Sequence, residues 1–386
     1  MDLGVLRDHI DDIDKQIIRL FEERMDVAEQ VARYKIGCGK PVYDPVRERS
    51  KIERAKDMAT SSFNARGVET LFNQLMAISR VRQYELVAEA HQDNFGFVEY
   101  SGDHSGARVV FQGVEGAYGH QATLGYFGKD ADCYHVKTFE DVMKEVHEGR
   151  ADYGVLPVEN SSTGIITDVY DLMHLYDNYI VGEYVVKVEH ALLGLPGTEI
   201  DQIKTVYSHP QGLLQCSRFL DEKPEWEQVS LQNTAVSARK VLVEQDKTQA
   251  AIASPAAAEY YSLSVLKEKI SDNDNNSTRF IIIRHKKEYV KGADGISISF
   301  ELANAHETGS LYHALGFIIY NSLNMTKIES RPIAGKTWEY RFFVDFEGNL
   351  EQPAVKNALR GLEAEANRMR VLGNYGQQEE EPNDQN

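Results

Sequence analysis

Cationic side chains occupy apolar positions in a heptad pattern near the N-terminus. Ile10 and Ile17 lie seven residues apart, and the next member of their series is Arg24. This spacing predicts one long helix over residues 3–36 with a continuous apolar face. Lys35 follows Arg24 by eleven residues, about three helical turns, and therefore shares that face. Arg24 could snorkel from a helical bundle to solvent, but two cations on one apolar face also suit a bound anion.

Two later segments place further polar groups on expected helical faces. Asp44 can cap a second helix that begins at Pro45, and a third helix is expected over residues 65–90. Taken singly, each segment is typical of an ordinary solvated helix. Polar residues that interrupt the apolar faces of several helices instead predict a polar pocket inside a bundle. The candidate pocket residues are Arg7, Arg24, Lys35, Asp44, Arg47, Glu48, Ser79 and Gln83.

The chemistry of this set is that of anion binding rather than of proton transfer. It contains cations, neutral donors and carboxylates, but no nucleophile–base pair and no metal-ligand cluster. A small dianion that carries a hydroxyl would suit it. Residues 3–86 resemble the all-helical chorismate mutases in the segments LRDHIDDIDKQII, ERMDVAEQVARYK and YDPVRER and in the Ser79–Gln83 pair. The resemblance implies a unimolecular rearrangement of chorismate to prephenate, catalysed by positioning and by stabilising charge on the breaking ether oxygen.

The same resemblance implies a role for each pocket residue. Arg7 and Arg24 would bind the two carboxylates of chorismate. Lys35 and Gln83 would donate hydrogen bonds to the ether oxygen. The ring hydroxyl and the remaining wall would be met by Asp44, Glu48, Arg47 and Ser79. A first helix of this length is expected to pair with a second subunit in a homodimer or higher homo-oligomer, so that Arg7 enters the partner's site.

Residues beyond about 107 alternate short apolar strands with amphipathic helices, which predicts an α/β domain with ligand sites in its loops. Four loops contain polar or glycine residues next to strand ends: GVEGAYGHQA (113–122), PVENSSTG (157–164), SHPQG (208–212) and NNSTRF (275–280). The glycines of the first loop do not match the dinucleotide fingerprint, although a glycine-rich loop that opens a helix suits a carboxylate. The third loop has no nucleophile elbow, so a serine hydrolase is poorly supported.

The last three loops, in this order and spacing, resemble the catalytic domain of prephenate dehydratases over residues 108–285. Ala117 and Gly119 depart from that pattern, because many relatives carry serine there. The resemblance implies loss of CO₂ and of the ring hydroxyl from prephenate, with Thr278 as the proton donor to the leaving oxygen and Arg279 as a carboxylate clamp. The other expected prephenate-binding residues are Glu159, Asn160, Ser161, Ser208, His209 and Gln211.

The C-terminal part of the chain reads as β-α-β-β-α-β over residues 296–373. Its motifs GSLYHAL and ESRP resemble those of the ACT domains of prephenate dehydratases, which bind amino acids at paired interfaces. The implied ligand is phenylalanine, the end product of the pathway, although a purely structural dimerisation domain is the alternative. The expected ligand residues are Gly309, Ser310, Leu311, Glu329, Ser330, Arg331 and Pro332.

Composition limits the remaining possibilities. The net charge of −18 over 386 residues argues against nucleic acid as a partner. No apolar run is long enough to span a membrane, and three scattered cysteines suit a reduced cytoplasmic compartment rather than disulfides or zinc. No metal or cofactor is expected.

The sequence therefore predicts a multidomain, bifunctional enzyme of phenylalanine biosynthesis with feedback inhibition by phenylalanine. The expected parts are an all-α mutase bundle (residues 1–92) and a linker (93–107). A two-lobed α/β dehydratase domain like periplasmic binding proteins (108–285), an α+β ACT domain (296–373) and a disordered acidic tail (374–386) are expected to follow. The alternatives are a mutase fused to a prephenate dehydrogenase, which would need the missing dinucleotide fingerprint, and a non-catalytic amino-acid sensor.

Overall fold

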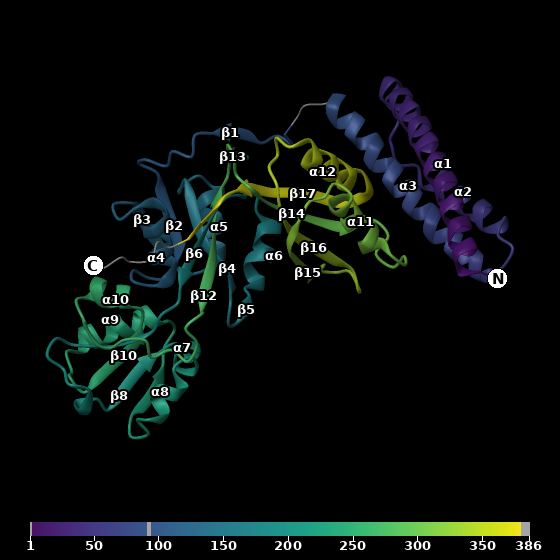
Figure 1. The fold of residues 1–386 in the computed structure, drawn as a ribbon. Helices are drawn as coiled ribbons and strands as arrows, with labels where there is room; N and C mark the ends of the chain where they lie inside the picture. Colours follow the sequence, from purple (N-terminus) through teal and green to yellow (C-terminus); the bar gives the residue numbers. More distant parts are fainter. Residues whose placement is uncertain (1, 91–93, 380–386) are drawn as a thin grey trace. The chain divides into compact units, whose positions relative to one another are not determined.

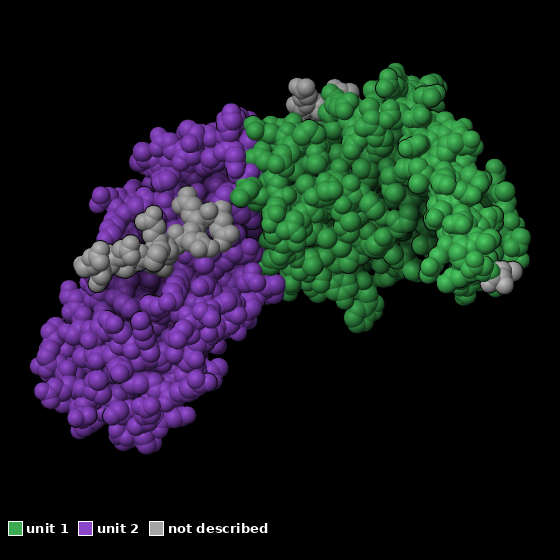
Figure 2. Space-filling view, viewed as in Figure 1, with its two compact units in different colours: residues 1–96, 294–371 green, residues 97–293, 372–386 purple. Residues whose placement is uncertain are grey.

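The computed structural model describes residues 2–90 and 94–379, which fall into two compact units (Figures 1 and 2). Unit 1 combines residues 1–96 with residues 294–371, and unit 2 combines residues 97–293 with residues 372–386. Unit 1 therefore contains both the expected mutase segment and most of the expected ACT segment. Within the described residues, none of the helices has the length and apolar character that crossing a membrane requires.

The N-terminal part of unit 1 consists of three helices, α1 (Leu3–Cys38), α2 (Pro45–Asp57) and α3 (Ser62–Ala90). The α1 helix ends at Gly39, whose φ of 66° is the left-handed conformation that favours glycine at a helix C-terminus. Asp44 caps α2 by accepting a hydrogen bond from the Arg47 amide at 3.0 Å, and Pro45 is in the first turn, as predicted. Both α1 and α2 pack against α3.

The predicted heptad face of α1 is largely exposed in the single chain. Ile10, Ile17 and Leu20 are each more than half exposed. Burial begins only at Ala28 and Ala32, where α1 meets α3. An apolar face of this length in contact with water is unusual for a helix that acts alone.

The C-terminal part of unit 1 has the β-α-β-β-α-β order that the sequence predicts. Its strands form a sheet in the order β15-β16-β14-β17, with α11 and α12 packed together and both in contact with α3. Gly361 on α12 allows this packing, because a Cβ atom there would lie 2.2 Å from the Phe317 ring on α11. The elements are β14 (Gly295–Leu302), α11 (Ser310–Ile319), β15 (Met325–Pro332), β16 (Tyr340–Glu347), α12 (Pro353–Glu365) and β17 (Ala366–Tyr375).

Unit 2 begins with an α/β lobe whose strands are ordered β6-β12-β4-β2-β3. The strands β2, β3 and β4 are parallel, whereas β12 is antiparallel to both β4 and β6. These strands are β2 (Arg108–Gln112), β3 (Asp132–Val136), β4 (Tyr153–Asn160), β6 (Tyr179–Lys187) and β12 (Ser277–Arg284). The helices of this lobe are α4 (Tyr118–Phe127), α5 (Phe139–His147) and α6 (Thr167–Leu175), and the short strand β5 (Gly164–Ile165) pairs with β4.

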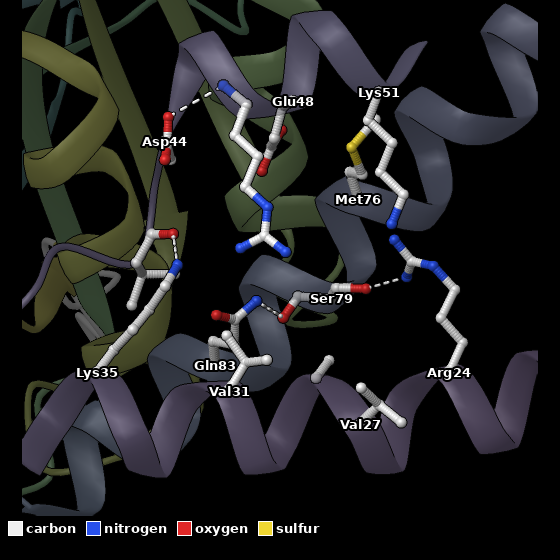
Figure 3. A pocket seen from close by; sticks show the side chains of 13 residues that line it. Arg24, Val27, Val31, Lys35, Asp44, Glu48, Lys51, Met76, Ser79 and Gln83 are labelled. Carbon is white, nitrogen blue, oxygen red and sulfur yellow. Dashed lines mark hydrogen bonds between the residues drawn. The ribbon is translucent and has the colours of Figure 1, made fainter. Parts of the chain in front are cut away.

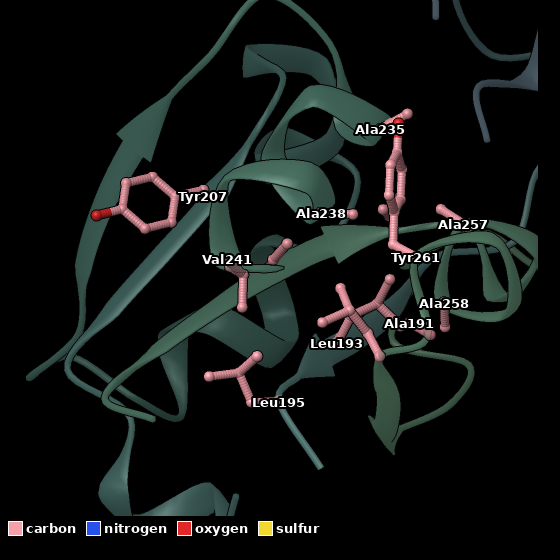
Figure 4. Packing of buried hydrophobic residues seen from close by; sticks show 13 residues of the cluster. Ala191, Leu193, Leu195, Tyr207, Ala235, Ala238, Val241, Ala257, Ala258 and Tyr261 are labelled. Atoms are coloured by element: carbon pink, nitrogen blue, oxygen red, sulfur yellow. The ribbon is translucent and has the colours of Figure 1, made fainter. Parts of the chain in front are cut away.

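A second lobe of unit 2 has its own five-stranded sheet, ordered β11-β7-β10-β8-β9. Its core includes Ala191, Leu193, Val241 and Tyr261 (Figure 4). The chain enters this lobe between β6 and β7 and returns between β11 and β12, so the predicted two-lobed arrangement is present. The elements are β7 (Ala191–Gly194), η1 (Ile200–Gln202), β8 (Thr205–Ser208), α7 (Pro210–Leu214), α8 (Ser217–Asp221), β9 (Glu227–Ser230), α9 (Thr234–Glu244), β10 (Gln249–Ala253), α10 (Pro255–Tyr261) and β11 (Ser264–Lys267).

Two predicted irregular segments contain strands. In the predicted linker, β1 (Val98–Tyr100) pairs in parallel with β13 (Glu288–Val290). In the predicted disordered tail, residues 374–375 belong to β17, and β18 (Gln377–Glu379) pairs with β6. The prediction of disorder is thus wrong for these residues, because backbone pairing does not depend on side-chain polarity. The rest of the tail, residues 380–386, lies outside the described residues.

Candidate active sites

The three N-terminal helices of unit 1, α1, α2 and α3, line a polar cavity of about 160 Å³ (Figure 3). All the predicted pocket residues line it except Arg7. A second cavity, of about 680 Å³, shares Lys35, Asp44 and Arg47 with the first and therefore borders it. Arg7 is exposed on α1, 17 residues before Arg24 and thus about 25 Å along the helix axis. Arg7 therefore cannot reach the cavity of its own chain.

Cations dominate the lining of this cavity. Arg24, Lys35 and Arg47 are joined by Lys51, which sequence analysis missed although it follows Arg47 by one helical turn. Burial lowers the pKa of the Arg24 guanidinium, and burial together with the neighbouring Arg47 lowers the pKa of Lys35. The lowered pKa values reflect cations that are incompletely compensated by the carboxylates of Asp44 and Glu48. An anion would restore that balance.

Neutral groups on α3 hold part of the lining in place. Arg24 donates hydrogen bonds to the Ser79 hydroxyl and to the Leu75 carbonyl oxygen, the latter at 2.9 Å. The Gln83 amide nitrogen donates to the Ser79 carbonyl oxygen at 3.1 Å, which leaves its second proton for another acceptor. Lys35 donates to the Val42 carbonyl oxygen at 2.6 Å. The lining is therefore organised before any ligand is present.

Polar residues of the PVENSSTG and NNSTRF loops in unit 2 meet at the end of β4 and the start of β12. Asn160 and Thr278 are register partners, and the Asn160 amide donates to the Thr278 hydroxyl oxygen at 2.9 Å. The same amide donates to the Asn276 side-chain oxygen at 2.8 Å, and Ser161 donates to the Asn275 carbonyl oxygen at 3.0 Å. Three predicted residues are thus brought together, and buried Asn276 joins them. Asn276 lies in the NNSTRF motif but was not singled out from the sequence.

Arg279 makes ion pairs that the sequence did not predict. Successive residues of a strand point to opposite faces of its sheet, so Arg279 and Thr278 do not share a face. The Arg279 guanidinium instead lies 3.1 Å from the Glu159 carboxylate and 3.2 Å from that of Glu183, which is 4% exposed. This ion-pair network also removes Glu159 from the face of Thr278. To act as a carboxylate clamp for a substrate at Thr278, the Arg279 guanidinium would have to leave these two carboxylates.

The SHPQG loop makes mostly local interactions. The Ser208 hydroxyl is fully buried and donates to the Ile252 carbonyl oxygen at 2.7 Å. His209 caps α7, because its Nδ1 atom accepts a hydrogen bond from the Gln211 amide at 3.1 Å. The position of Ser208 indicates a role in packing the second lobe, whereas the His209 side chain is exposed and accessible to a ligand.

A third cavity, of about 310 Å³, lies in the C-terminal part of unit 1. Gly309, Ser310 and Leu311 line it, as predicted for the first ACT motif. The second motif, residues 329–332, lies on the edge strand β15 and does not line it. Sequence analysis missed the aromatic residues of the lining, which are Tyr312, Trp338, Tyr340 and Phe342.

Comparisons with known proteins agree with this division of sites. Residues 6–84 match the family model of chorismate mutase type II, and residues 109–288 match that of prephenate dehydratase. A bifunctional chorismate mutase/prephenate dehydratase from Enterobacter agglomerans is 35% identical over 378 residues, which are 97% of this chain and 95% of that protein. The chain belongs to the bifunctional chorismate mutase/prephenate dehydratases. It is thus a multifunctional enzyme of phenylalanine biosynthesis with both activities.

Two solved structures resemble about 70% of the chain. A prephenate dehydratase from Arthrobacter aurescens in complex with L-Phe is 29% identical, with a TM-score of 0.64 over 89% of that chain. GqqA, described as a novel type of quorum quenching acylase, is 30% identical, with a TM-score of 0.64 over 98% of that chain. One fold thus carries different described activities, and the residues of each site must decide the function.

Proposed function

We propose that the cationic cavity of unit 1 is the mutase site and that Thr278 is the general acid of the dehydratase site. The observation that supports the first assignment is the convergence of Arg24, Lys35, Arg47 and Lys51 around two carboxylates in one cavity. Chorismate is a dianion with a ring hydroxyl, so it supplies both the charge that the cations lack and a donor for the carboxylates.

The mutase reaction then follows from positioning and electrostatics. Arg24 holds one carboxylate of chorismate, and Arg7 of a second copy of the chain holds the other. Lys35 and the second amide proton of Gln83 donate to the ether oxygen as its bond to the ring breaks and negative charge grows on it. Groups already held in place stabilise this charge without reorganising, which is the main source of acceleration in such sites. Glu48 accepts the one hydrogen bond that the ring hydroxyl can donate, and Asp44 completes the wall beside it.

The dehydratase reaction needs a proton at the departing hydroxyl group. The Thr278 O–H donates this proton, and water leaves. The electron pair of the breaking C–CO₂ bond enters the ring as CO₂ departs, which gives phenylpyruvate. The hydrogen bond from Asn160 supports this role, because it occupies a lone pair of Thr278, leaves the hydroxyl proton free to be donated, and stabilises the oxygen once the proton has gone.

Self-association explains the exposed face of α1. A second copy of the chain would cover Ile10, Ile17 and Leu20 and would bring in Arg7, which lies about 25 Å from its own cavity. We therefore propose a homodimer or higher homo-oligomer with mutase sites shared between subunits. Mixing inactive Arg7→Ala and Lys35→Ala proteins should restore some mutase activity, because mixed dimers contain one intact site.

Phenylalanine is the proposed feedback inhibitor. The aromatic lining of the third cavity suits its ring, and the Arthrobacter aurescens structure is a complex with L-Phe. Leu311→Glu places a charge in this lining and should abolish inhibition of the dehydratase by phenylalanine, with uninhibited turnover retained. Equal inhibition of Leu311→Glu and the unaltered enzyme would place the phenylalanine site elsewhere.

The assignment of the mutase cavity has a direct test. The protein supplied with chorismate should produce phenylpyruvate, and Lys35→Ala should fail to do so while still converting supplied prephenate. Chorismate turnover that is unaffected by Lys35→Ala would contradict the assignment of the cavity.

A further inference from the structure

Arg80 connects the mutase cavity with the C-terminal part of unit 1. It follows Ser79 on α3 and is 6% exposed. Its Nη1 atom donates to the Glu48 carboxylate, which lines the cavity. Its Nε atom lies 2.7 Å from the Glu365 carboxylate at the end of α12. The Tyr43 ring covers the guanidinium, with 5.1 Å between the ring centroid and the Arg80 Cζ atom.

The helical geometry of α3 explains how Arg80 reaches both carboxylates. One residue advances about 100° around a helix, so Arg80 lies beside the face that Ser79 and Gln83 present to the cavity. The same side of α3 packs against α11 and α12. The Tyr84 ring meets the Phe317 ring edge-on with 5.8 Å between centroids, and the Gln74 amide donates to the Tyr312 hydroxyl at 3.0 Å. Arg80 therefore lies in a continuous interface between the mutase helices and the C-terminal part of unit 1.

The balance of charge in this cluster is incomplete. Two carboxylates share one guanidinium, and the side chains of Arg80, Glu365 and Glu48 are only 8%, 11% and 22% exposed. Glu48 also faces the cavity cations Lys35 and Arg24, whereas the Glu365 carboxylate is compensated by Arg80, so Glu365 depends more strongly on this guanidinium. Burial raises the pKa of both the Glu48 and the Glu365 carboxyl groups, despite the opposing effect of Arg80. Glu48 and Glu365 thus compete for Arg80.

We propose that Arg80 is a positioning residue of the mutase reaction, through which Glu365 of α12 sets how strongly Glu48 binds the substrate. The proposal rests on the assignment of Glu48 as an acceptor for the ring hydroxyl of chorismate. While Glu365 is ionised, it competes with Glu48 for the Arg80 guanidinium. The Glu48 carboxylate then remains a strong hydrogen-bond acceptor for the substrate. When Glu365 is neutral or displaced, Arg80 interacts with Glu48 alone. The hydrogen bond between Glu48 and the substrate is then weaker.

The experiment uses the full chain with a matched pair of substitutions. Glu365→Gln removes the charge from the cluster with little change in shape, and Glu363→Gln makes the same change on the same helix at an exposed position. Glu365→Gln should raise KM for chorismate about three- to tenfold, since weakening one hydrogen bond costs up to about 1.4 kcal/mol. The value of kcat should change less than KM. Glu363→Gln should leave both constants unchanged, and both variants should convert supplied prephenate normally.

A double-mutant cycle distinguishes this route from a general effect on packing. Glu48→Gln removes the charge that competes for Arg80, so Glu365→Gln should have no further effect on chorismate kinetics in that background. The same fold-change with and without Glu48→Gln would overturn the proposal. So would a Glu365→Gln protein with normal KM for chorismate.

A second variant tests the guanidinium itself. Arg80→Lys keeps the positive charge but replaces a fork that reaches two carboxylates with a single ammonium group. It should raise KM for chorismate at least as much as Glu365→Gln. Unchanged kinetics in Arg80→Lys would also contradict the proposal. If Glu48→Gln alone leaves chorismate kinetics unchanged, the assignment of Glu48 to the substrate fails as well. If only the Glu365 and Arg80 variants are normal, that assignment stands and only the connection to α12 fails.

Discussion

The mutase cavity and the dehydratase cluster solve different chemical problems with different groups. The cavity presents four cations from helices α1 and α2 to a reaction that transfers no proton. The cluster presents neutral hydroxyl and amide groups from β4, β12 and their loops to a reaction that requires a proton. Its nearby cation, Arg279, is engaged with Glu159 and Glu183. Fixed charge suits a transition state that develops charge, whereas a directed hydroxyl suits one that loses a leaving group.

The largest effect is expected at Lys35. Lys35→Ala removes the charge that faces the ether oxygen and should raise the mutase barrier by about two to four kcal/mol, the usual scale for loss of an oxyanion donor. Conversion of supplied prephenate serves as the control for folding. Burial lowers the pKa of Lys35, so this side chain loses its proton at a lower pH than an ordinary lysine. The mutase rate of the unaltered enzyme should therefore fall at pH values below the ordinary lysine pKa. Gln83 carries no ionisable group. A mutase rate that falls above neutral pH with the pKa of a carboxyl group would therefore contradict its role as a neutral donor.

Arg279 tests whether a cation of unit 2 serves the fold or the substrate. Arg279→Leu leaves the buried Glu183 carboxylate without this partner and should destabilise unit 2 by about 3 kcal/mol, as when one member of a buried ion pair is removed. The expected signature is a lower Tm with KM for prephenate nearly unchanged in the folded fraction. A normal Tm with a strongly raised KM would restore the carboxylate-clamp role that the sequence predicted.

Thr278 tests the proton donor. Thr278→Ala should lower dehydratase kcat by roughly a hundredfold or more, the scale for a lost acid–base group, with a small change in KM. Thr278→Ser keeps the hydroxyl and should keep substantial activity. Mutase activity should survive both substitutions. If Thr278→Ala raised KM and left kcat normal, the threonine would be a binding residue, and the donor would have to be sought elsewhere, at His209.

The smallest effect concerns the pH dependence of stability at Glu365. Burial raises the pKa of its carboxyl from 4.5 to about 7, so between these values the folded state binds more protons than the unfolded state. The free energy of unfolding should therefore fall as the pH rises through this window, by on the order of 2 kcal/mol. Glu365→Gln should lose this part of the dependence and be more stable than the unaltered protein at pH 8. Other titrating neighbours, including His313, Tyr43 and Tyr84, are the same in both proteins, so the difference isolates Glu365.

Sequence patterns predicted the mutase cavity better than the dehydratase cluster for a physical reason. Helical spacing fixes which side chains share a face, so Arg24, Lys35, Ser79 and Gln83 could be grouped before any tertiary structure was known. In a strand, by contrast, the spacing rule places adjacent residues on opposite faces of the sheet. The adjacent Thr278 and Arg279 point to opposite faces, and the motif alone does not show this.

Partners distant in sequence left no local signal. The role of Arg80 depends on Glu365, which is 285 residues later in the chain. Its adjacency to Ser79 was visible, but no periodic pattern connects α3 with α12. Trp338 was missed in a similar way, because an exposed aromatic residue between strands shows no burial pattern until the cavity around it is formed.

Helix α3 serves both the mutase cavity and the packing against α11 and α12, which limits where such a gene can be divided. One side of the helix carries Ser79 and Gln83, and another carries Arg80 and Tyr84 against α11 and α12. A fragment cut after residue 92 would keep every cavity residue of its chain, yet it would expose the Tyr84 side and leave Arg80 without Glu365. A free-standing mutase derived from this chain would therefore need compensating changes along α3, so gene fission would not yield a working half at once.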